Sequence, residues 1–336
     1  MNGARSLTCL LGLAFAGCAH PPLTADATSA PLPARPSVPR VDTLSLPSPD
    51  WAQAPVRVDV HLPPGYDPAA GRGYPVLYLN DGQDAAAVSL QPTLARLYEQ
   101  GRIRPVIVVA IHMLPDRMGT YGLSDRAAGH SLPATTRHGR VGALAHEYSE
   151  WVSRALVPLI DARYRTRPSP DARAVLGWSL GGLNAFNLAW QYPEQFGRIG
   201  AFSPSFWLAG DHTDDQTVQA TRLAHAMIDR SEPRTGLKLF FAVGSAEETD
   251  DRDGDGIIDV LDDARDLMLG HGTTEAPTAR GLAQLGYSTN PEHATRPARA
   301  DAAMFVMEGG EHNQASWARM LPEFLRWAYG RDASLL

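Results

Sequence analysis

The pentapeptide at residues 177–181, Gly-Trp-Ser-Leu-Gly, constrains the fold more than any other part of the sequence. A short apolar run at residues 174–176 precedes it, and a helix-forming segment at residues 183–192 follows. A serine in a tight strand-to-helix turn needs small residues two positions away on either side. Such a turn projects its hydroxyl above the carboxyl end of a sheet, beside a helix N-terminus that favours negative charge. The pattern therefore predicts that Ser179 is a nucleophile.

Strand-like and helix-like segments alternate along the chain. Val56, Val58 and Val60 alternate with polar residues, as in a half-buried strand. Runs that are apolar at nearly every position, typical of buried parallel strands, lie at residues 75–79, 105–111, 174–176, 199–202, 237–243 and 303–307. Helices are expected at residues 91–100, 141–164 and 183–192 and near the C-terminus, and a long loop at residues 112–140. This alternation predicts an α/β fold with a mostly parallel central sheet and helices on both faces.

The N-terminus has the pattern of an export signal. Arg5 precedes an apolar run at residues 7–16, which is too short to span a bilayer as a helix. Small residues then precede Cys18, and this arrangement resembles a bacterial lipoprotein signal, with an ordinary cleaved signal peptide as the alternative. We therefore expect residues 1–17 to be a signal peptide and Cys18 to be lipidated. The protein would be exported and anchored to the membrane of the bacterial envelope, in the outer membrane or periplasm.

The amino-acid composition distinguishes a predicted tether from a predicted folded domain. Residues 18–50 are rich in Pro, Ala, Ser and Thr, which predicts a disordered tether, and residues 51–336 form the predicted folded domain. The net charge of −7 provides no basic face, so no nucleic-acid partner is expected. Both cysteines, Cys9 and Cys18, precede the domain and exclude a disulfide framework within it. No later segment is apolar for the roughly 18 residues that a membrane span requires.

Several separated blocks resemble the esterase family of α/β-hydrolases. That family includes enterochelin esterases, feruloyl and acetyl xylan esterases, S-formylglutathione hydrolases and mycolyltransferases. The resemblance covers about residues 56–329 and implies the α/β-hydrolase fold, an acyl-enzyme mechanism and no organic cofactor. Its marks are LPPGY at 62–66, YPVLYLNDGQ at 74–83, PLIDARYRT at 158–166, the pentapeptide at 177–181, YPEQFG at 192–197, SPSFW at 203–207 and GGEH at 309–312.

The remaining catalytic residues follow the order serine, acid, histidine. His312 follows the strand at residues 303–307, so it is the expected base that takes the Ser179 proton and returns it to the leaving alcohol. The acid should lie in the turn after residues 237–243. The resemblance implies Glu247 there, three residues beyond a glycine, with Glu248 and Asp250 as alternatives.

An oxyanion hole needs two backbone N–H donors. One is expected at Leu180, directly after the nucleophile. The resemblance implies that the other is Gln83. The two tryptophans Trp178 and Trp207 are expected either to line a substrate pocket or to pack in the core.

An aspartate-rich segment follows the expected acid. Positions 1, 3, 5, 9 and 12 of an EF-hand-type loop are aspartates, and position 7 would contribute a carbonyl oxygen. These ligands would be Asp251, Asp253, Asp255, Asp259 and Asp262, with the carbonyl of Ile257. Five close carboxylates repel one another unless a cation neutralises them, and hard oxygen ligands suit Ca²⁺. The spacing predicts a structural calcium loop at residues 251–262, with a solvated acidic loop as the alternative.

The residues and the resemblance together predict a serine carboxylic ester hydrolase. Its substrate would be a small-molecule or polysaccharide-linked ester, such as a siderophore lactone or a feruloyl or acetyl group on plant polysaccharide. An acyltransferase on the same scaffold and a non-catalytic cell-surface binding protein are the alternatives.

Overall fold

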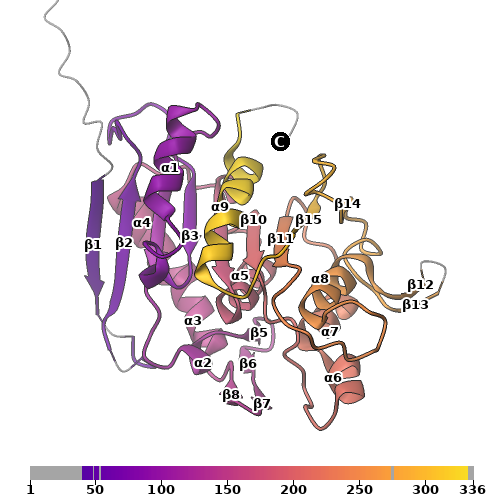
Figure 1. Ribbon diagram of the computed structural model, residues 1–336. Helices are drawn as coiled ribbons and strands as arrows, with labels where there is room; N and C mark the ends of the chain where they lie inside the picture. Colours follow the sequence, from indigo (N-terminus) through magenta and orange to yellow (C-terminus); the bar gives the residue numbers. More distant parts are fainter. Residues whose placement is uncertain (1–39, 48, 53, 274–275, 332–336) are drawn as a thin grey trace, which may run out of the picture. The chain divides into compact units, whose positions relative to one another are not determined.

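A central sheet of nine strands organises the described part of the chain, which comprises residues 40–331 without 48, 53 and 274–275 of the computed structural model (Figure 1). The strand order is β1-β2-β4-β3-β9-β10-β11-β15-β14. The strands are β1 (Arg40–Leu46), β2 (Val56–Leu62), β3 (Val76–Leu79), β4 (Ile107–Ile111), β9 (Arg173–Trp178), β10 (Arg198–Phe202), β11 (Lys238–Gly244), β14 (Thr289–Asn290) and β15 (Ala302–Met307). The predicted signal peptide, Cys18 and the predicted tether up to residue 39 lie outside the described residues.

The sheet is parallel from β4 to β14, and only the pairs β1–β2 and β2–β4 are antiparallel. Its central strands are buried along nearly their whole length, because helices cover both faces. This explains why the sequence shows continuous apolar runs rather than alternation. The predicted α/β fold is confirmed.

Helices pack on each face of the sheet (Figure 1). One face carries α1 (Leu90–Glu99) and α9 (Gln314–Tyr329), whose apolar residues share a core with Leu77, Leu176 and Phe240. The other face carries α3 (Ala145–Trp151), a π-helical segment (Val152–Leu156), α4 (Val157–Arg163), α5 (Leu180–Gln191), α7 (Leu223–Arg230) and α8 (Asp259–Leu269). Among the described residues, no helix combines the length and the apolar character needed to cross a bilayer.

The long loop predicted at residues 112–140 is instead folded into short elements. They are α2 (Arg117–Thr120) and two hairpins, β5 (Leu123–Asp125) with β6 (His130–Leu132) and β7 (Ala134–Thr136) with β8 (Gly139–Val141). Elements of three or four residues are too short to leave a periodic pattern in the sequence. Tertiary contacts hold them, since Tyr121 and Leu123 are buried and the Ser124 N–H donates to Asn187 Oδ1 at 2.8 Å.

The predicted tether is wrong over its last part, because Arg40–Leu46 form the edge strand β1. This strand pairs with β2 along its whole length, from Arg40 opposite Leu62 to Leu46 opposite Val56. Leu44 and Leu46 pack against the core, and the rest of the strand is polar or exposed. An edge strand buries apolar residues on one side only, so its signal is weak beside the proline-rich sequence around it.

The remaining elements complete the connections between the main strands and helices. They are the 3₁₀ helices at Gly82–Asp84 and Pro170–Ala172, α6 (Asp215–Thr221), β12 (His271–Thr273) and β13 (Ala276–Ala279). The helix predicted at residues 141–164 is present but contains the π-helical segment. Pro158 lies in the first turn of α4, directly after that segment. There the Val157 N–H bonds to the carbonyl of Val152, five residues back.

Candidate active site

The turn after β11 and the loop after β15 meet at the carboxyl end of the sheet. The Ser245 N–H donates to the Met307 carbonyl at 3.0 Å, and the Ala246 N–H donates to the Gly310 carbonyl at 2.9 Å. A Cβ on Gly244 would lie 2.3 Å from the Gly310 carbonyl oxygen, so both backbones must come this close without a side chain between them. This approach brings Glu247 and His312 together.

Glu247 is the acidic residue that contacts His312. Its Oε2 lies 2.9 Å from Nδ1 of the imidazole, and its side chain is 1% exposed, whereas that of His312 is 40% exposed. Glu248, a predicted alternative, accepts instead from the N–H of Val260 at 2.6 Å. Asp250, the other alternative, accepts through its backbone carbonyl from the N–H of Asp259 at 2.9 Å. Of the three candidate acids that the sequence left open, Glu247 is therefore the one that contacts His312.

Ser179 lies at the strained turn between β9 and α5. Its φ of 56° and ψ of −127° fall in a region that side-chain-bearing residues rarely adopt. A Cβ on Gly177 would lie 2.1 Å from the Gly181 carbonyl oxygen, and one on Gly181 would lie 2.5 Å from Asp81 Oδ2. The turn thus requires both glycines of the pentapeptide.

The strand order places Ser179 near the acid and the histidine. β10 lies between β9 and β11, and β15 borders β11, so the segments following these strands gather at one edge of the sheet. Among the described residues, no hydrogen bond joins the hydroxyl of Ser179 to His312. The structure therefore joins Glu247 directly to His312 and brings Ser179 to the same edge through its strand.

The two expected oxyanion donors follow neighbouring strands. Leu180 begins α5 after β9, and Gln83 lies in the 3₁₀ helix after β3, which pairs with β9. Each N–H is in the first turn of its helix, where no intrahelical carbonyl can accept it. A Cβ on Gly82 would lie 2.6 Å from the Ala110 carbonyl carbon, so this glycine lets the Gln83 turn pack against β4. Both N–H groups therefore lie near the carboxyl edge of the sheet, each in a first helical turn.

Arg117 ties these two turns together. Its Nε and Nη2 donate to the two carboxylate oxygens of Asp81 at 2.8 and 2.7 Å, and Nη2 also lies 3.4 Å from the Trp178 carbonyl oxygen. The Asp81 side chain is buried, and its N–H donates to the Tyr121 hydroxyl at 3.1 Å. A bidentate arginine–carboxylate pair fixes orientation as well as distance. Arg117 therefore links the strand end before Ser179 to the turn that carries Gln83.

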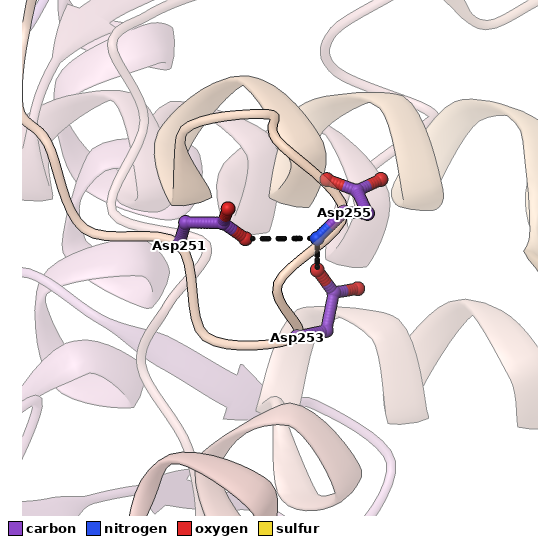
Figure 2. Close-up of side chains that lie close together, drawn as sticks. All are labelled: Asp251, Asp253 and Asp255. Carbon is purple, nitrogen blue, oxygen red and sulfur yellow. Dashed lines mark hydrogen bonds between the residues drawn. The ribbon is translucent and has the colours of Figure 1, made fainter.

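Three of the six predicted calcium ligands converge in the acidic loop (Figure 2). Asp251, Asp253 and Asp255 are exposed, and each offers a carboxylate oxygen within 4.8 Å of the others. The Asp255 N–H donates to both Asp251 and Asp253, at 3.2 and 3.3 Å, as the dashed lines show. Three close carboxylate oxygens have the chemistry that a hard cation such as Ca²⁺ requires.

The other three predicted ligands are arranged differently. Asp259 begins α8, and its carboxylate pairs with Arg252 Nη1 at 3.2 Å. Asp262 is buried in the first turn of α8, and burial, together with the charges of Asp266 and Asp253, raises its pKa to about 6. The N–H of Ile257 donates to Asp255 Oδ1 at 2.8 Å. Among the described residues, the convergent carboxylates are therefore the exposed Asp251, Asp253 and Asp255, whereas Asp259 is paired with Arg252 and Asp262 is buried.

Comparison with known proteins identifies the family. The family described as "Putative esterase" matches residues 52–327. The chain belongs to this esterase family. Over 191 residues it is 26% identical to the uncharacterized protein YbbA of Bacillus subtilis, a match that covers 57% of this chain and 68% of YbbA. Over 171 residues it is 27% identical to an endo-1,4-beta-xylanase/feruloyl esterase of Xylanibacter ruminicola, covering 48% of this chain but only 21% of that protein.

A solved structure supports the same fold. The enterobactin esterase of Shigella flexneri, crystallised in the presence of enterobactin, aligns with a TM-score of 0.56 and 18% sequence identity. The alignment covers 87% of this chain and 60% of that chain. At this level of identity, the likeness establishes the fold of the esterase family for this chain.

Within this esterase site, two contacts were not predicted from the sequence. Ser203, directly after β10, donates to Glu247 Oε1 at 2.6 Å, and Trp317 of α9 donates its indole N–H to Ser203 Oγ at 2.8 Å. A polar residue directly after a parallel strand is a usable signal for Ser203, because such residues reach the carboxyl edge. Trp317 offers no comparable signal, since only the packing of α9 brings it to the site.

The two tryptophans near the site have different roles. Trp178 is buried and stacks on Trp317, with ring centroids 5.5 Å apart. Trp207 is half-buried and lines a cavity of about 660 Å³ beside the acid turn. The cavity is also lined by Arg137, His138, His212, Glu248 and Thr249. Trp178 therefore packs in the core, and Trp207 packs against the core while also lining this cavity. None of Ser179, Glu247 and His312 is among the residues that line the cavity.

Proposed function

We propose that this chain hydrolyses a carboxylic ester through an acyl-enzyme formed on Ser179, with His312 as general base and acid and Glu247 as the orienting carboxylate. The observation that carries the proposal is the 2.9 Å contact between the buried Glu247 and His312, at the sheet edge that also carries the strained Ser179 turn. Membership of the esterase family supports the reaction class.

The proposed mechanism follows from the donors around Glu247. An ionised carboxylate only accepts hydrogen bonds, so Nδ1 of His312 carries a proton and its Nε2 is left as the base. Nε2 takes the proton of Ser179 as the hydroxyl oxygen attacks the ester carbonyl carbon. The resulting oxyanion is bound by the N–H groups of Leu180 and Gln83.

The acyl-enzyme then forms and breaks by the same proton transfers. The tetrahedral intermediate expels the alcohol, which takes its proton from His312, and the acyl group remains on Ser179. Water replaces the alcohol, gives a proton to His312 and attacks the acyl carbon. Ser179 leaves as the acid product forms and recovers its proton from the imidazole.

The test is hydrolysis of p-nitrophenyl acetate and butyrate by the wild type and by Ser179→Ala. We expect kcat to fall by on the order of 10⁴-fold or more, because the nucleophile is removed while binding is kept. Ser45→Ala, on the exposed face of β1, is the matched control and should keep full activity. Equal rates for Ser179→Ala and the wild type would overturn the proposal.

For the substrate, we propose a small-molecule or polysaccharide-linked ester. Two comparisons support this class: the similarity to a protein named for feruloyl esterase activity and the shared fold of an enterobactin esterase. A panel of feruloyl, acetyl-xylan and catecholate-lactone esters would rank the candidates, and an added acceptor alcohol would reveal acyl transfer in place of hydrolysis.

We also propose that residues 251–262 bind a structural Ca²⁺. The spacing of the aspartates and the convergence of Asp251, Asp253 and Asp255 support the site. The loop begins four residues beyond Glu247 and leads into α8, whose second residue, Val260, bonds Glu248. An ion there would order the segment between the acid turn and the helix.

Finally, we propose that the protein is exported and lipid-anchored through Cys18. The support is the sequence pattern of the first 18 residues. Metabolic labelling with a lipid probe should mark the wild type but not Cys18→Ala, and the variant should leave the membrane fraction. Equal labelling of both proteins would exclude Cys18 as the anchor.

A further inference from the structure

Ser203 occupies a fixed position between the strands that carry the proposed nucleophile and acid. It follows β10, is fully buried and has a φ of 45°, in the left-handed region. Its N–H donates to the Ala242 carbonyl of β11 at 2.7 Å. A buried, non-glycine residue with a positive φ costs free energy and persists only where its surroundings hold it in place.

The hydroxyl of Ser203 has a single possible direction. The indole N–H of Trp317 is a donor only, so Ser203 Oγ accepts from it across the 2.8 Å contact. The one proton of the hydroxyl is then left for Glu247 Oε1 at 2.6 Å. The chain of hydrogen bonds therefore runs from Trp317 through Ser203 to Glu247.

These contacts hold both oxygens of the Glu247 carboxylate. Oε1 accepts from Ser203 and from the N–H of Gly244, each at 2.6 Å, and Oε2 faces His312 Nδ1. The side chain is 1% exposed, so water cannot easily replace a lost donor. With the hydroxyl removed, only the Gly244 N–H would hold Oε1.

Trp317 contacts the histidine as well as the serine. Its ring lies edge-on to the imidazole of His312, with centroids 5.4 Å apart, and stacks on Trp178. One side chain of α9 therefore orients Ser203 and also limits the tilt of His312. The same tryptophan therefore contacts His312 directly and reaches Glu247 through Ser203.

We propose that Ser203 is a positioning residue, whose hydroxyl, oriented by Trp317, locks the Glu247 carboxylate in the rotation that presents Oε2 to His312. This inference rests on the proposed function, because Ser203 acts only through Glu247. Among the described residues, its side chain makes hydrogen bonds to Glu247 and Trp317 and none to Ser179.

The first test is Ser203→Ala, assayed with p-nitrophenyl butyrate. We expect kcat to fall by about 10- to 100-fold, the range for losing one hydrogen bond to a charged group, with KM within about twofold of the wild type. Ser203→Gly also lacks the hydroxyl but suits the positive φ, so it should show the same loss in a backbone free of strain. Ser205→Ala is the matched control, since Ser205 is a buried serine of the same segment.

Trp317→Phe tests the direction of the network. Phenylalanine keeps a ring against His312 and Trp178 but cannot donate to Ser203. We expect a smaller loss of kcat, about 3- to 10-fold, typical of one hydrogen bond between neutral groups. In the Ser203→Ala background the same change should add less than it does alone, because the hydroxyl that it orients is already absent.

The decisive measurement places Ser203→Ala in the Glu247→Ala background. If Ser203 acts through Glu247, the second substitution lowers kcat no further. If Ser203→Ala lowers kcat by the same factor in both backgrounds, Ser203 has a purely structural role and the inference is wrong. Ser179→Ala distinguishes failure of this inference from failure of the proposed function. If Ser179→Ala is inactive while Ser203→Ala lowers kcat equally in both backgrounds, the proposed function stands and the role of Ser203 is wrong.

Discussion

The acid turn and the acidic loop contain carboxylates only four residues apart that are held in opposite ways. Glu247 is buried, and its two oxygens face donors from Ser203, Gly244 and His312. Asp251 and its two neighbours in the loop are exposed and accept from N–H groups of their own loop. None of the ion pairs found in the described part of the chain involves these three aspartates.

The difference shows how the charge of a buried carboxylate and that of an exposed carboxylate are each stabilised. A buried carboxylate surrounded by fixed donors is committed to one partner, because turning away would leave those donors unsatisfied. Exposed carboxylates that converge on one point repel one another and gain from an ion supplied by the solvent. We therefore expect the acid turn to control the catalytic rate and the acidic loop to control the stability of the adjoining segment.

The largest effect should separate two adjacent glutamates. Glu247→Gln should lower kcat by on the order of 10⁴-fold, because the amide cannot stabilise the imidazolium and disturbs the tautomer of His312. Glu248→Gln should stay within about twofold of the wild type, since Glu248 bonds Val260 instead. Steady-state hydrolysis of p-nitrophenyl butyrate measures both. A comparable loss in Glu248→Gln would mean that the acid is assigned to the wrong residue.

An intermediate effect should come from calcium. At about 100 times the Kd, the ion would stabilise the fold by about 2.7 kcal/mol and raise Tm by several degrees. Asp253→Asn should remove most of this shift, because it deletes one of the three convergent carboxylates.

Thermal melts in EDTA and in added CaCl₂ measure the calcium effect, with the exposed Glu308→Gln as the matched control. The same two conditions should be compared for kcat, which we expect to fall severalfold in EDTA, because the segment that the ion would stabilise adjoins the acid turn. If chelation changes neither Tm nor kcat, residues 251–262 form a solvated acidic loop. The expectation that a bound ion stabilises the adjoining segment is then wrong.

The smallest effect should be a pH dependence of the stability, which arises from Glu248 between the acid turn and the acidic loop. Burial, together with the charges of Asp259, Asp250 and Asp263, raises the pKa of Glu248 above its ordinary value of 4.5, although the Val260 N–H opposes the shift. The folded state then binds this proton more tightly than the unfolded state. The resulting stability is present below pH 4.5 and is lost as pH rises through the higher folded pKa.

Glu248→Gln removes this titration and keeps an oxygen that can accept from Val260. In EDTA, the Tm of the variant relative to the wild type should therefore increase by a degree or two between pH 4 and pH 7. Glu308→Gln should show no such trend. A constant difference across this range would show that the environment of Glu248 resembles that of the exposed acids.

The sequence could predict whatever depends on strands and their ends. Apolar runs located the central strands to within two residues at each end, because a strand covered on both faces has few polar positions. A meeting between His312 and an acid of the turn after β11 was predictable for a related reason, since residues after adjacent parallel strands reach the same edge. The choice of Glu247 over Glu248 and Asp250 was implied by the family resemblance, and Glu247 is the one that contacts His312. The position of Ser179 in a strand-to-helix turn followed from the glycines that flank it.

The contacts that orient the site could not be predicted in this way. Arg117 comes from a helix of four residues, and Trp317 from a long helix whose rotation depends on its packing. Their partners, Asp81 and Ser203, are separated from them by 36 and 114 residues. No periodicity or local propensity records such pairings, because they arise only when the sheet and its helices assemble.

The edge strand β1 has a practical consequence for handling the protein. A chain shortened to begin at Trp51, the boundary that composition predicts, would lack β1 and leave one side of β2 unpaired. That side carries a row of free N–H and C=O groups on a strand whose valines are buried. Unpaired edges of this kind recruit strands from other molecules, so such a truncated chain should aggregate at concentrations where one that keeps residues 40–46 remains dispersed.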